Sequence, residues 1–386
     1  MLTISQATAA LKDYYLGVIT NQLNTKINPL MARIAQSTEN VYGKDVVKVM
    51  GFGMNGGIGA GEETGDLPKA AENKYAKITV PLKNLYGRIE LSDKVIRASQ
   101  HSSGAFVNML NAEMEGLLEA AAMNLSRMLY GDGTGKLATI SAVETSGDKA
   151  VTVDSAKKFI EGMLVKVSSG VSEVAELRVR VVNRDENKVI FDGTQTGLAK
   201  DQIITVAAGS NLELTGLEKA LGTSSTIYGA SRSANPFLIP HIDSATTSVT
   251  ETAIQSAIDA VEESTGDNIN FIACSYGVRR ALQNHLATYR RNIDTMNLEG
   301  GFRALSYNGI PVVADRFCAD KTMYLLNTDY FTLYQLCDWE WLEGENGSVL
   351  KQIPGTATYS ATLVKYAELL CEKIRAQAVF TNLTEA

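Results

Sequence analysis

Two stretches between residues 46 and 99 are rich in hydrophobic residues, and a long polar segment rich in glycine separates them. The first stretch is Val46–Met50, and the second contains Ile78–Leu82 and Tyr86–Ser92. Two such runs with turn residues between them predict two β-strands joined by a glycine-rich tip, in a hairpin that occupies residues 46–99. An isolated two-stranded hairpin is only marginally stable in water. We therefore expect this extended loop to lie on a neighbouring subunit, which indicates assembly rather than catalysis.

Helical spacing precedes the hairpin. Apolar residues recur at helical intervals from residue 3 to about 36, and Pro29 interrupts them. We therefore predict an N-terminal arm over residues 1–45, with a helix, a break and a short helical continuation. The arm could pack against other subunits or against its own core, and the sequence favours neither.

A longer helical pattern follows the hairpin, within a predicted segment of residues 100–140. Apolar residues recur every three or four positions from Val107 to Leu129, which is typical of a helix with one apolar face. Ser102 or Ser103 can cap its start, and we expect Gly131 to end it as a C-cap glycine. A helix of this length, roughly 40 Å, can serve as a spine on which sheets rest.

The rest of the chain predicts further β structure. Short β-rich runs separated by turn residues indicate an inserted all-β domain over residues 141–212, a small barrel or sandwich. Strands and helices alternate over residues 213–337, where Ser248–Glu251 forms a capping box before a helix that Gly266 ends. The alternation between Tyr359 and Phe380 predicts sheet, within a segment of residues 338–386 whose strands return to the body of the molecule. The fold class is therefore α+β, with the all-β domain as an insertion.

Composition and charge narrow the possible functions. The net charge is −7 and no basic cluster stands out, so we do not expect the chain to hold nucleic acid through its phosphates. A mildly acidic wall would repel nucleic acid, which suits a protein that encloses nucleic acid better than one that binds it. No apolar run approaches the roughly 20 residues that a membrane span needs, and residues 1–6 carry no secretory signal. The cysteines lack C-x-x-C spacing and are expected to be buried free thiols in a reducing cytosol: Cys274, Cys318, Cys337 and Cys371.

Motifs that could carry chemistry are incomplete. Gly131–Lys136 is similar to a phosphate-binding loop, but one residue is missing before the Gly-Lys pair and the segment ends a helix instead of opening one. Gly57–Gly61 lacks the strand–helix unit of a dinucleotide site. The histidines lie in different segments, none with a second His or a Cys at metal-ligand spacing. We therefore expect no catalytic residue, no metal site and no cofactor.

The run Asp338–Glu345 has the most unusual local composition, with two tryptophans among acidic residues. It could bind sugar or calcium, although the spacing of an EF-hand is absent. Trp339 and Trp341 are two positions apart, which places both on one face of a strand. We favour both side chains as packing or interface anchors.

The order of these parts resembles the major capsid proteins of tailed double-stranded DNA bacteriophages, which share the Hong Kong ninety-seven fold. The hairpin is similar to the family's extended loop, and the helix Phe106–Tyr130 with the glycines after it is similar to its spine helix. Asn308–Asp315, Met323–Asn327 and Asp338–Trp341 are similar to the sheet of its axial domain and the return to its peripheral domain. The resemblance covers nearly the whole chain except about residues 141–210, an insertion of the kind that some members carry.

The resemblance implies a structural protein that assembles with copies of itself into pentamers and hexamers, which form an icosahedral shell around double-stranded DNA. It implies a virion protein assembled in the host cytoplasm, with no catalysis, no cofactor and no membrane. Many members begin with a long scaffolding segment, for which the chain before residue 45 leaves little room. This departure implies a separate scaffolding protein, or a mature chain as given. A portal protein is a further expected partner.

Charged residues of the predicted hairpin are the candidate contacts between subunits. We expect them to form ion pairs at the rim of the interface, which set register more than affinity. The candidate contact residues are Glu62, Glu63, Asp66, Lys69, Lys74, Lys77, Arg88 and Glu90.

Three other functions remain open from the sequence. The same fold could form the shell of a bacterial nanocompartment, an encapsulin-like container for a cargo enzyme. A secreted carbohydrate-binding or adhesive protein could use the β-rich segment and the tryptophan strand, although the missing secretory signal argues against it. An α/β enzyme built on residues 213–330 would need a pocket of converging polar groups, and the sequence singles out none.

Overall fold

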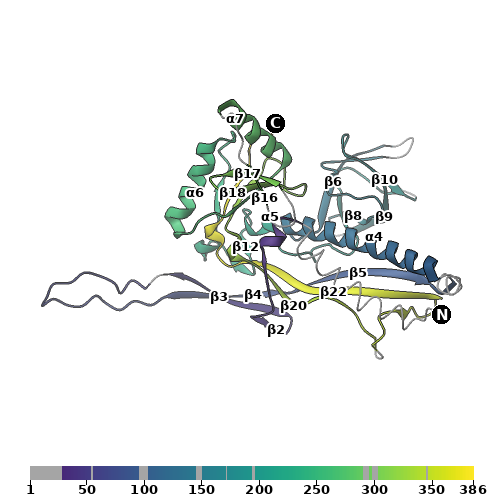
Figure 1. Cartoon of the computed structure of the whole chain (residues 1–386), viewed down its shortest axis with the longest axis horizontal. Helices are drawn as coiled ribbons and strands as arrows, with labels where there is room; N and C mark the ends of the chain where they lie inside the picture. Colours follow the sequence, from purple (N-terminus) through teal and green to yellow (C-terminus); the bar gives the residue numbers. More distant parts are fainter. Residues whose placement is uncertain are drawn as a thin grey trace.

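The computed structural model describes most of the chain. The described residues are 28–53, 55–94, 103–144, 150–170, 172–193, 196–289, 295–297, 303–344 and 347–386. The predicted arm helix before Pro29 lies outside them. Figure 1 shows an elongated molecule in which a hairpin projects far from a body built of sheets, helices and a barrel. Within the described ranges, no helix combines the length and apolarity that a membrane crossing needs.

The projecting hairpin is built from two strands and a long tip. Strands β3 (Asp45–Gly53) and β4 (Lys74–Pro81) pair antiparallel, from Asp45 opposite Pro81 to Gly53 opposite Lys74. The short strand β2 (Val41–Tyr42) pairs with the start of β3. Residues 55–73 form the tip and contain no strand. A hairpin with a glycine-rich tip was predicted, and the structure confirms it.

The chain after Leu82 corrects the prediction of a hairpin over residues 46–99. Strand β5 (Lys83–Ser92) leaves the hairpin and pairs antiparallel with β22 (Thr358–Cys371) along its whole length. Burial explains the difference, because the alternating side chains of Leu85, Ile89 and Leu91 are enclosed in the main core of the subunit. A free hairpin arm offers no such cover for three large apolar side chains.

The sheet that receives β5 forms the centre of the molecule. In it β22 pairs with β20 (Phe331–Trp341) and β21 (Lys351–Gln352), and β20 pairs in parallel with β1 (Ala35–Ser37). The spine helix α4 (Ser103–Tyr130) runs along this sheet (Figure 1). It packs tightly on β5, since a Cβ at Gly87 would lie 2.9 Å from the side chain of Leu117. The predicted limit between residues 337 and 338 falls inside β20, which is one continuous strand.

The described end of the arm packs on its own subunit. After Pro29 the chain forms a single 3-10 turn, η3 (Met31–Arg33), and then enters β1, so the predicted helical continuation is wrong. Leu30 and Met31 are buried in the main core. Their burial there outweighs helical spacing over so short a segment. Residues 28–37 therefore pack on the core of their own subunit, which was one of the two alternatives for the arm.

Residues 136–206 form a closed barrel, one of the two architectures that the β-rich pattern predicted. The strands in spatial order are β10 (Lys188–Asp192), β7 (Val151–Val153), β6 (Lys136–Val143), β11 (Ile203–Val206), β8 (Leu164–Ser169) and β9 (Ser172–Asn183). Phe159, Val165 and Ile204 are fully enclosed in its core. The barrel begins at Lys136, before the predicted limit at residue 141, because the chain enters β6 directly from the turn after α4.

A mixed seven-stranded sheet with two helices forms the remaining body. Its strands in spatial order are β14 (His241–Asp243), β23 (Ala378–Phe380), β19 (Met323–Leu326), β15 (Phe271–Cys274), β18 (Ile310–Ala314), β17 (Arg303–Tyr307) and β16 (Thr295–Asn297). Helices α6 (Glu251–Thr265) and α7 (Tyr276–Tyr289) share one core with Ile272 and Cys274 of β15. Phe271 and Ala273 belong to the main core, so the sheet separates the two cores.

Short elements connect these units. They are α5 (Leu217–Ala220), β12 (Thr226–Ile227), β13 (Ala230–Ser231), η4 (Pro236–Leu238), η6 (Thr328–Tyr330) and η7 (Ile374–Ala376).

The start of α6 differs from the predicted capping box. Thr250 is the N-cap, and its hydroxyl oxygen accepts a hydrogen bond from the Ala253 N–H at 3.1 Å. Glu251 is therefore the first helical residue and stands too early to complete a box with Ser248. Gly266 ends the helix with a left-handed φ of 72°, as predicted.

Helix α4 ends at Tyr130, as predicted, but the left-handed glycines come later. Gly131 is not in the left-handed region, whereas Gly133 and Gly135 have φ values of 81° and 75°. A Cβ at Gly135 would lie 2.5 Å from the carbonyl oxygen of Gly209. These glycines therefore serve the close approach of the two chain segments that enter and leave the barrel.

Candidate assembly surface

The hairpin tip leaves large apolar side chains in water. Residues 58–70 are all exposed, and Ile58 and Leu67 show 90% and 88% of their surface to solvent. Four glycines before Glu62 leave the backbone of the tip accessible. Burial of two large apolar side chains in an interface would remove their surface from water, which is energetically favourable. The tip is therefore the first candidate for contact with another molecule.

The stem of the hairpin, in contrast, is held by its own subunit. Val46, Met50, Ile78 and Val80 are buried in the main core. The ring of Phe52 stacks on that of Phe237 in η4, with centroids 4.8 Å apart and planes at 7°. The chain thus fixes the direction of the hairpin up to the end of β3 and exposes what lies beyond. This refines the expectation that the whole hairpin lies on a neighbour.

The structure gathers six of the eight predicted contact residues on the hairpin. Glu62, Glu63, Asp66 and Lys69 are exposed in the tip, and Lys74 and Lys77 are exposed on β4. Lys77 lies opposite Val49, which is 58% exposed. Charged and apolar groups are therefore mixed on this surface. Their contact with another subunit stays a prediction.

Arg88 and Glu90 are not part of the hairpin. They lie on the exposed face of β5, where Arg88 Nη2 is 2.9 Å from Glu90 Oε1. Both side chains are about half exposed, at 51% and 52%. An exposed pair of this kind contributes at most about 1 kcal/mol. The sequence misplaced these two residues because it assigned β5 to the wrong sheet.

Trp339 and Trp341 are buried on the same face of β20, as their spacing predicted. Both belong to the main core of the subunit. The ammonium group of Lys365 lies 5.7 Å from the Trp339 ring and donates to Asp338 Oδ1 at 2.8 Å. Burial is the largest effect on Lys365 and lowers its pKa. The acidic aromatic run is thus tied into the central sheet through this lysine.

A buried ion pair that the sequence did not reveal joins the spine helix to the exit of the barrel. Arg127 of α4 donates from Nη1 to Glu213 Oε2 at 2.8 Å and from Nη2 to Glu213 Oε1. Each side chain is only 3% exposed. The partners are 86 positions apart in the sequence. An arginine among the apolar positions of a helix was the available signal, but nothing local identifies its partner.

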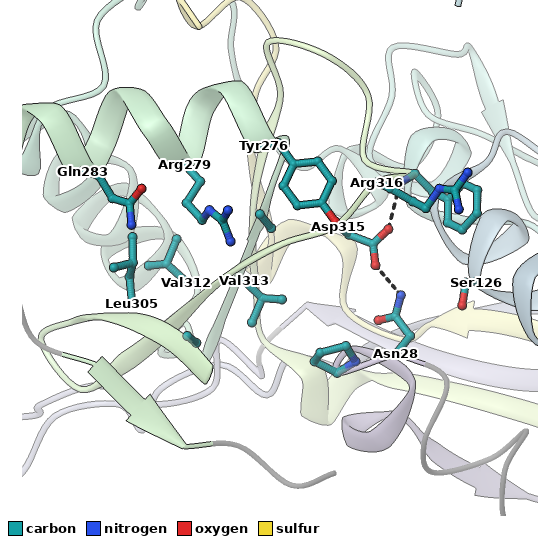
Figure 2. Close-up of a pocket in the computed structure, with 14 residues that line it drawn as sticks. Asn28, Ser126, Tyr276, Arg279, Gln283, Leu305, Val312, Val313, Asp315 and Arg316 are labelled. Atoms are coloured by element: carbon teal, nitrogen blue, oxygen red, sulfur yellow. Dashed lines mark hydrogen bonds between the residues drawn. The ribbon is translucent and has the colours of Figure 1, made fainter. Parts of the chain in front are cut away.

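A pocket of about 490 Å³ between the arm and α7 is the candidate for chemistry (Figure 2). Arg279 and Gln283 line one side, and Asn28 and Asp315 line the other. Asp315 accepts hydrogen bonds from the Asn28 amide at 2.5 Å and from the Phe317 N–H at 2.8 Å, and burial raises the pKa of its carboxyl. These bonds occupy the carboxylate, so it ties the arm to the end of β18.

The cysteines are free thiols. Cys274, Cys318 and Cys371 are buried, and Cys337 is half-buried. Burial raises the pKa of Cys274 to about 12, which keeps the thiol protonated and a poor nucleophile. Across the described part of the chain, no group of three or more His, Cys, Asp or Glu residues is placed to hold a metal ion.

Comparisons with known proteins bear on the fold. No family model matches the sequence, and no curated protein matches it. The structure is similar to a chain of the Cyanophage A-1(L) capsid asymmetric unit, with a TM-score of 0.56 over 93% of this chain and 94% of that chain, at 13% identity. The capsid of Myoviridae phage XM1 matches with a TM-score of 0.46 and 11% identity over 92% and 91% of the two chains.

A chain of the holo-SrpI encapsulin complex of Synechococcus elongatus matches with a TM-score of 0.45 and 10% identity over 81% of this chain and 78% of that chain. The similarity to the cyanophage capsid chain shows the fold, because its TM-score exceeds 0.5 and it extends over nearly the full length of both chains. It agrees with the projecting hairpin, the spine helix and the two sheets described above. The chain therefore has the fold of the tailed-phage capsid proteins, the Hong Kong ninety-seven fold, with a closed barrel inserted after the spine helix.

Proposed function

We propose that this chain is a major capsid protein, whose copies assemble into pentamers and hexamers and close an icosahedral shell around double-stranded DNA. The fold that it shares with the cyanophage capsid chain supports the proposal. The observation that carries it is the hairpin tip, which places Ile58 and Leu67 in water at the end of a rigidly directed stem. An isolated subunit gains nothing from this exposure, whereas a neighbouring copy can bury both side chains.

The geometry of such a contact suits a ring. A projection that docks on a different surface of the next copy makes a head-to-tail contact, and contacts of this kind close rings when the rotation between copies permits. Each contact is small, but many of them act together once a ring and then a shell closes. We therefore expect assembled subunits to be more stable than free ones.

The proposed surroundings follow from the same function. The chain would be a component of the virion, assembled in the host cytoplasm together with a separate scaffolding protein and a portal protein. The net charge of −7 supports enclosure of DNA without a sequence-specific grip on it. No catalytic role is part of the proposal.

Electron microscopy of the purified protein, alone and with a candidate scaffolding protein, tests this function. The matched control replaces residues 54–73 with an Asn-Gly turn between Gly53 and Lys74, which preserves the β3–β4 ladder. We expect closed shells or rings from the full chain and only free subunits from the control. Monodisperse single subunits from the full chain under all these conditions would refute the proposal.

The contents of the particles separate this function from that of a nanocompartment. Particles from infected or lysogenic cells should contain double-stranded DNA, measured by absorbance ratio and nuclease treatment after opening. A cargo enzyme in place of DNA would instead assign the chain to the encapsulin-like alternative.

A further inference from the structure

We infer that Asn55, in the exposed hairpin tip, is a site of spontaneous covalent modification, at which the side-chain amide is lost and aspartate or isoaspartate forms. The inference concerns the single subunit, so it goes beyond the proposed shell and does not depend on it. The chain contains three Asn-Gly pairs, of which the structure describes two in full, Asn55-Gly56 and Asn308-Gly309. Their different geometries single out the first pair.

Asn55 begins a turn in which its own side chain is the acceptor. The Gly57 N–H donates to Asn55 Oδ1 at 2.8 Å. A turn closed in this way holds the side-chain carbonyl against the backbone of the intervening residue, Gly56. The carbon of that carbonyl is therefore kept close to the Gly56 nitrogen, the atom that attacks it when a five-membered ring closes. Proximity of this kind strongly accelerates reactions within one molecule.

The Gly56 nitrogen is accessible for this reaction. The β3–β4 ladder ends at Gly53 opposite Lys74, and among the described residues no acceptor takes the Gly56 N–H. Asn55 and Gly56 are both exposed, so water can remove the amide proton. Glycine also places no Cβ beside the attacking nitrogen. Exposure, an N–H outside the ladder and the absence of side-chain crowding thus coincide at this position.

The reaction consumes water and releases ammonia, and no electron is transferred. The Gly56 nitrogen gives its proton to water or hydroxide and bonds to Asn55 Cγ, while the Gly57 N–H stabilises the negative charge that develops on Oδ1. The Cγ–Nδ2 bond then breaks, Nδ2 takes up a proton, and ammonia leaves a cyclic imide. Water that adds at Cγ restores the normal peptide bond and gives aspartate. Water that adds at the main-chain carbonyl carbon leaves the chain linked through Cγ, as isoaspartate.

The pair Asn308-Gly309 is also exposed but is held differently. It forms the two-residue turn between β17 and β18, with left-handed φ values of 50° and 81°. Both central residues of a type I′ turn have positive φ, and the pairing of Tyr307 with Ile310 closes this one. Asn308 Nδ2 donates to Gln255 Oε1 at 3.4 Å, which ties the side-chain amide to α6. Ring closure would require this turn to open, so we expect Asn308 to keep its amide.

The product changes the tip in two ways. Each conversion adds one negative charge to a segment in which Glu62, Glu63 and Asp66 already outnumber Lys69. Isoaspartate also inserts an additional backbone atom before Gly56. Subunits that remain free therefore accumulate a modified tip with time.

Peptide mapping by mass spectrometry tests the site. The purified full chain is incubated in water enriched in heavy oxygen, and the peptides that contain Asn55 and Asn308 are compared over time. The Asn55 peptide should incorporate heavy oxygen at least about tenfold faster than the Asn308 peptide, and faster still as pH rises. An isoaspartyl methyltransferase should label the same peptide. In urea both turns are lost, so the two rates should become similar.

Variants of the tip separate the geometry from the exposure. Gly56→Ala places a Cβ beside the attacking nitrogen, at an ordinary 3.6 Å from the Ala71 Cβ, and should slow the conversion roughly tenfold. Gly61→Ala is the matched control and should leave the rate unchanged, since its Cβ would lie 3.8 Å from the nearest atom. Asn55→Gln should abolish the conversion, because its longer side chain would have to close a six-membered ring.

The outcomes are distinct. Conversion that prefers Asn55 in the folded chain, and that is slowed by Gly56→Ala but not by Gly61→Ala, supports the inference. Retention of the Asn55 amide, equal rates at Asn55 and Asn308 in the folded chain, or equal rates in the two glycine variants overturns it. The proposed shell function stands or fails separately, by the microscopy described above.

Discussion

The buried pair of Arg127 and Glu213 allows the sharpest prediction about the fold of the subunit. Glu213→Gln keeps the size of the side chain and removes its charge, which leaves the Arg127 guanidinium buried without a counter-ion. The Arg127 Nε already has no hydrogen-bond partner in the described structure, so little else compensates its charge. The side-chain amide oxygen of Asn124, Oδ1, accepts from Arg127 Nη2 at 3.2 Å and provides only a neutral partner.

The expected cost follows from the burial of both groups. Removal of one partner from a buried ion pair typically destabilises a protein by about 3–5 kcal/mol. Both side chains are 3% exposed, so the full range applies with little solvent screening. An exposed pair, in contrast, contributes at most about 1 kcal/mol. Arg88→Ala, which removes the exposed partner of Glu90, is therefore the matched control.

Urea unfolding followed by circular dichroism measures the difference. We expect Glu213→Gln to lose about 3–5 kcal/mol of unfolding free energy, and Arg88→Ala to lose no more than about 1 kcal/mol. The double variant Arg127→Met with Glu213→Leu should recover most of the loss, because apolar groups of similar volume often replace buried ion pairs without cost. A loss for Glu213→Gln no larger than that for Arg88→Ala would refute the claim that this pair joins the spine helix to the barrel.

Three other predictions address burial, packing and capping. Burial raises the pKa of Glu368 to about 7 from an ordinary 4.5. Between pH 4.5 and 7 the unfolded chain therefore loses this proton while the folded chain keeps it, so the free energy of unfolding falls as pH rises, by about 3 kcal/mol in total. Thermal melts should show a flatter pH dependence for Glu368→Gln, and an unchanged slope would contradict the raised pKa of Glu368. Gly216→Ala should prevent normal folding, because its Cβ would lie 2.2 Å from the Met128 carbonyl oxygen. The control Gly116→Ala on α4 should fold normally, because its Cβ meets nothing within 4 Å. Equal soluble yields of the two variants would contradict the expected clash at Gly216. Thr250→Ala should cost about 1 kcal/mol of unfolding free energy, and Ser248→Ala should cost little, since Thr250 is the residue that caps α6. A larger loss for Ser248→Ala than for Thr250→Ala, measured by urea unfolding, would instead support the capping box that begins at Ser248.

Local pattern predicted those elements whose partners are near in the sequence or whose period is regular. The spine helix ends at Tyr130 as expected, and the β-rich runs all became strands of the barrel. The buried strand at Phe271–Cys274 was visible as a short apolar run between helices. In each case at least one face of the element is apolar over its whole length, so propensity, period and burial agree.

Pairing over long sequence distances could not be predicted from local pattern. Strand β5 alternates like the hairpin strands before it, and only its partner β22, some 270 positions later, assigns it to the central sheet. Arg88 and Glu90 were misplaced for this reason. The partner of Arg127 was equally hidden, because it lies beyond the barrel. Alternation shows that a residue has a buried face, but it does not show which surface covers that face.

The sequence predicted the hairpin as the contact surface, and the structure removes Arg88 and Glu90 from it. Glycines and charged residues between Met50 and Ile78 predicted a tip, and the structure places residues 55–73 at the end of the projection. A groove of about 350 Å³ at the base of the hairpin had no local signature, since residues of β5, α4, β11 and β20 line it. Tertiary contacts alone bring these elements together.

Sedimentation velocity over a range of concentrations tests the central claim most directly, with the full chain compared with the chain in which an Asn-Gly turn replaces residues 54–73. The account predicts large, uniform particles for the full chain above a critical concentration, and slowly sedimenting subunits for the shortened chain at every concentration. If both chains sediment alike, whether as particles or as subunits, the hairpin tip does not drive assembly and the account is wrong.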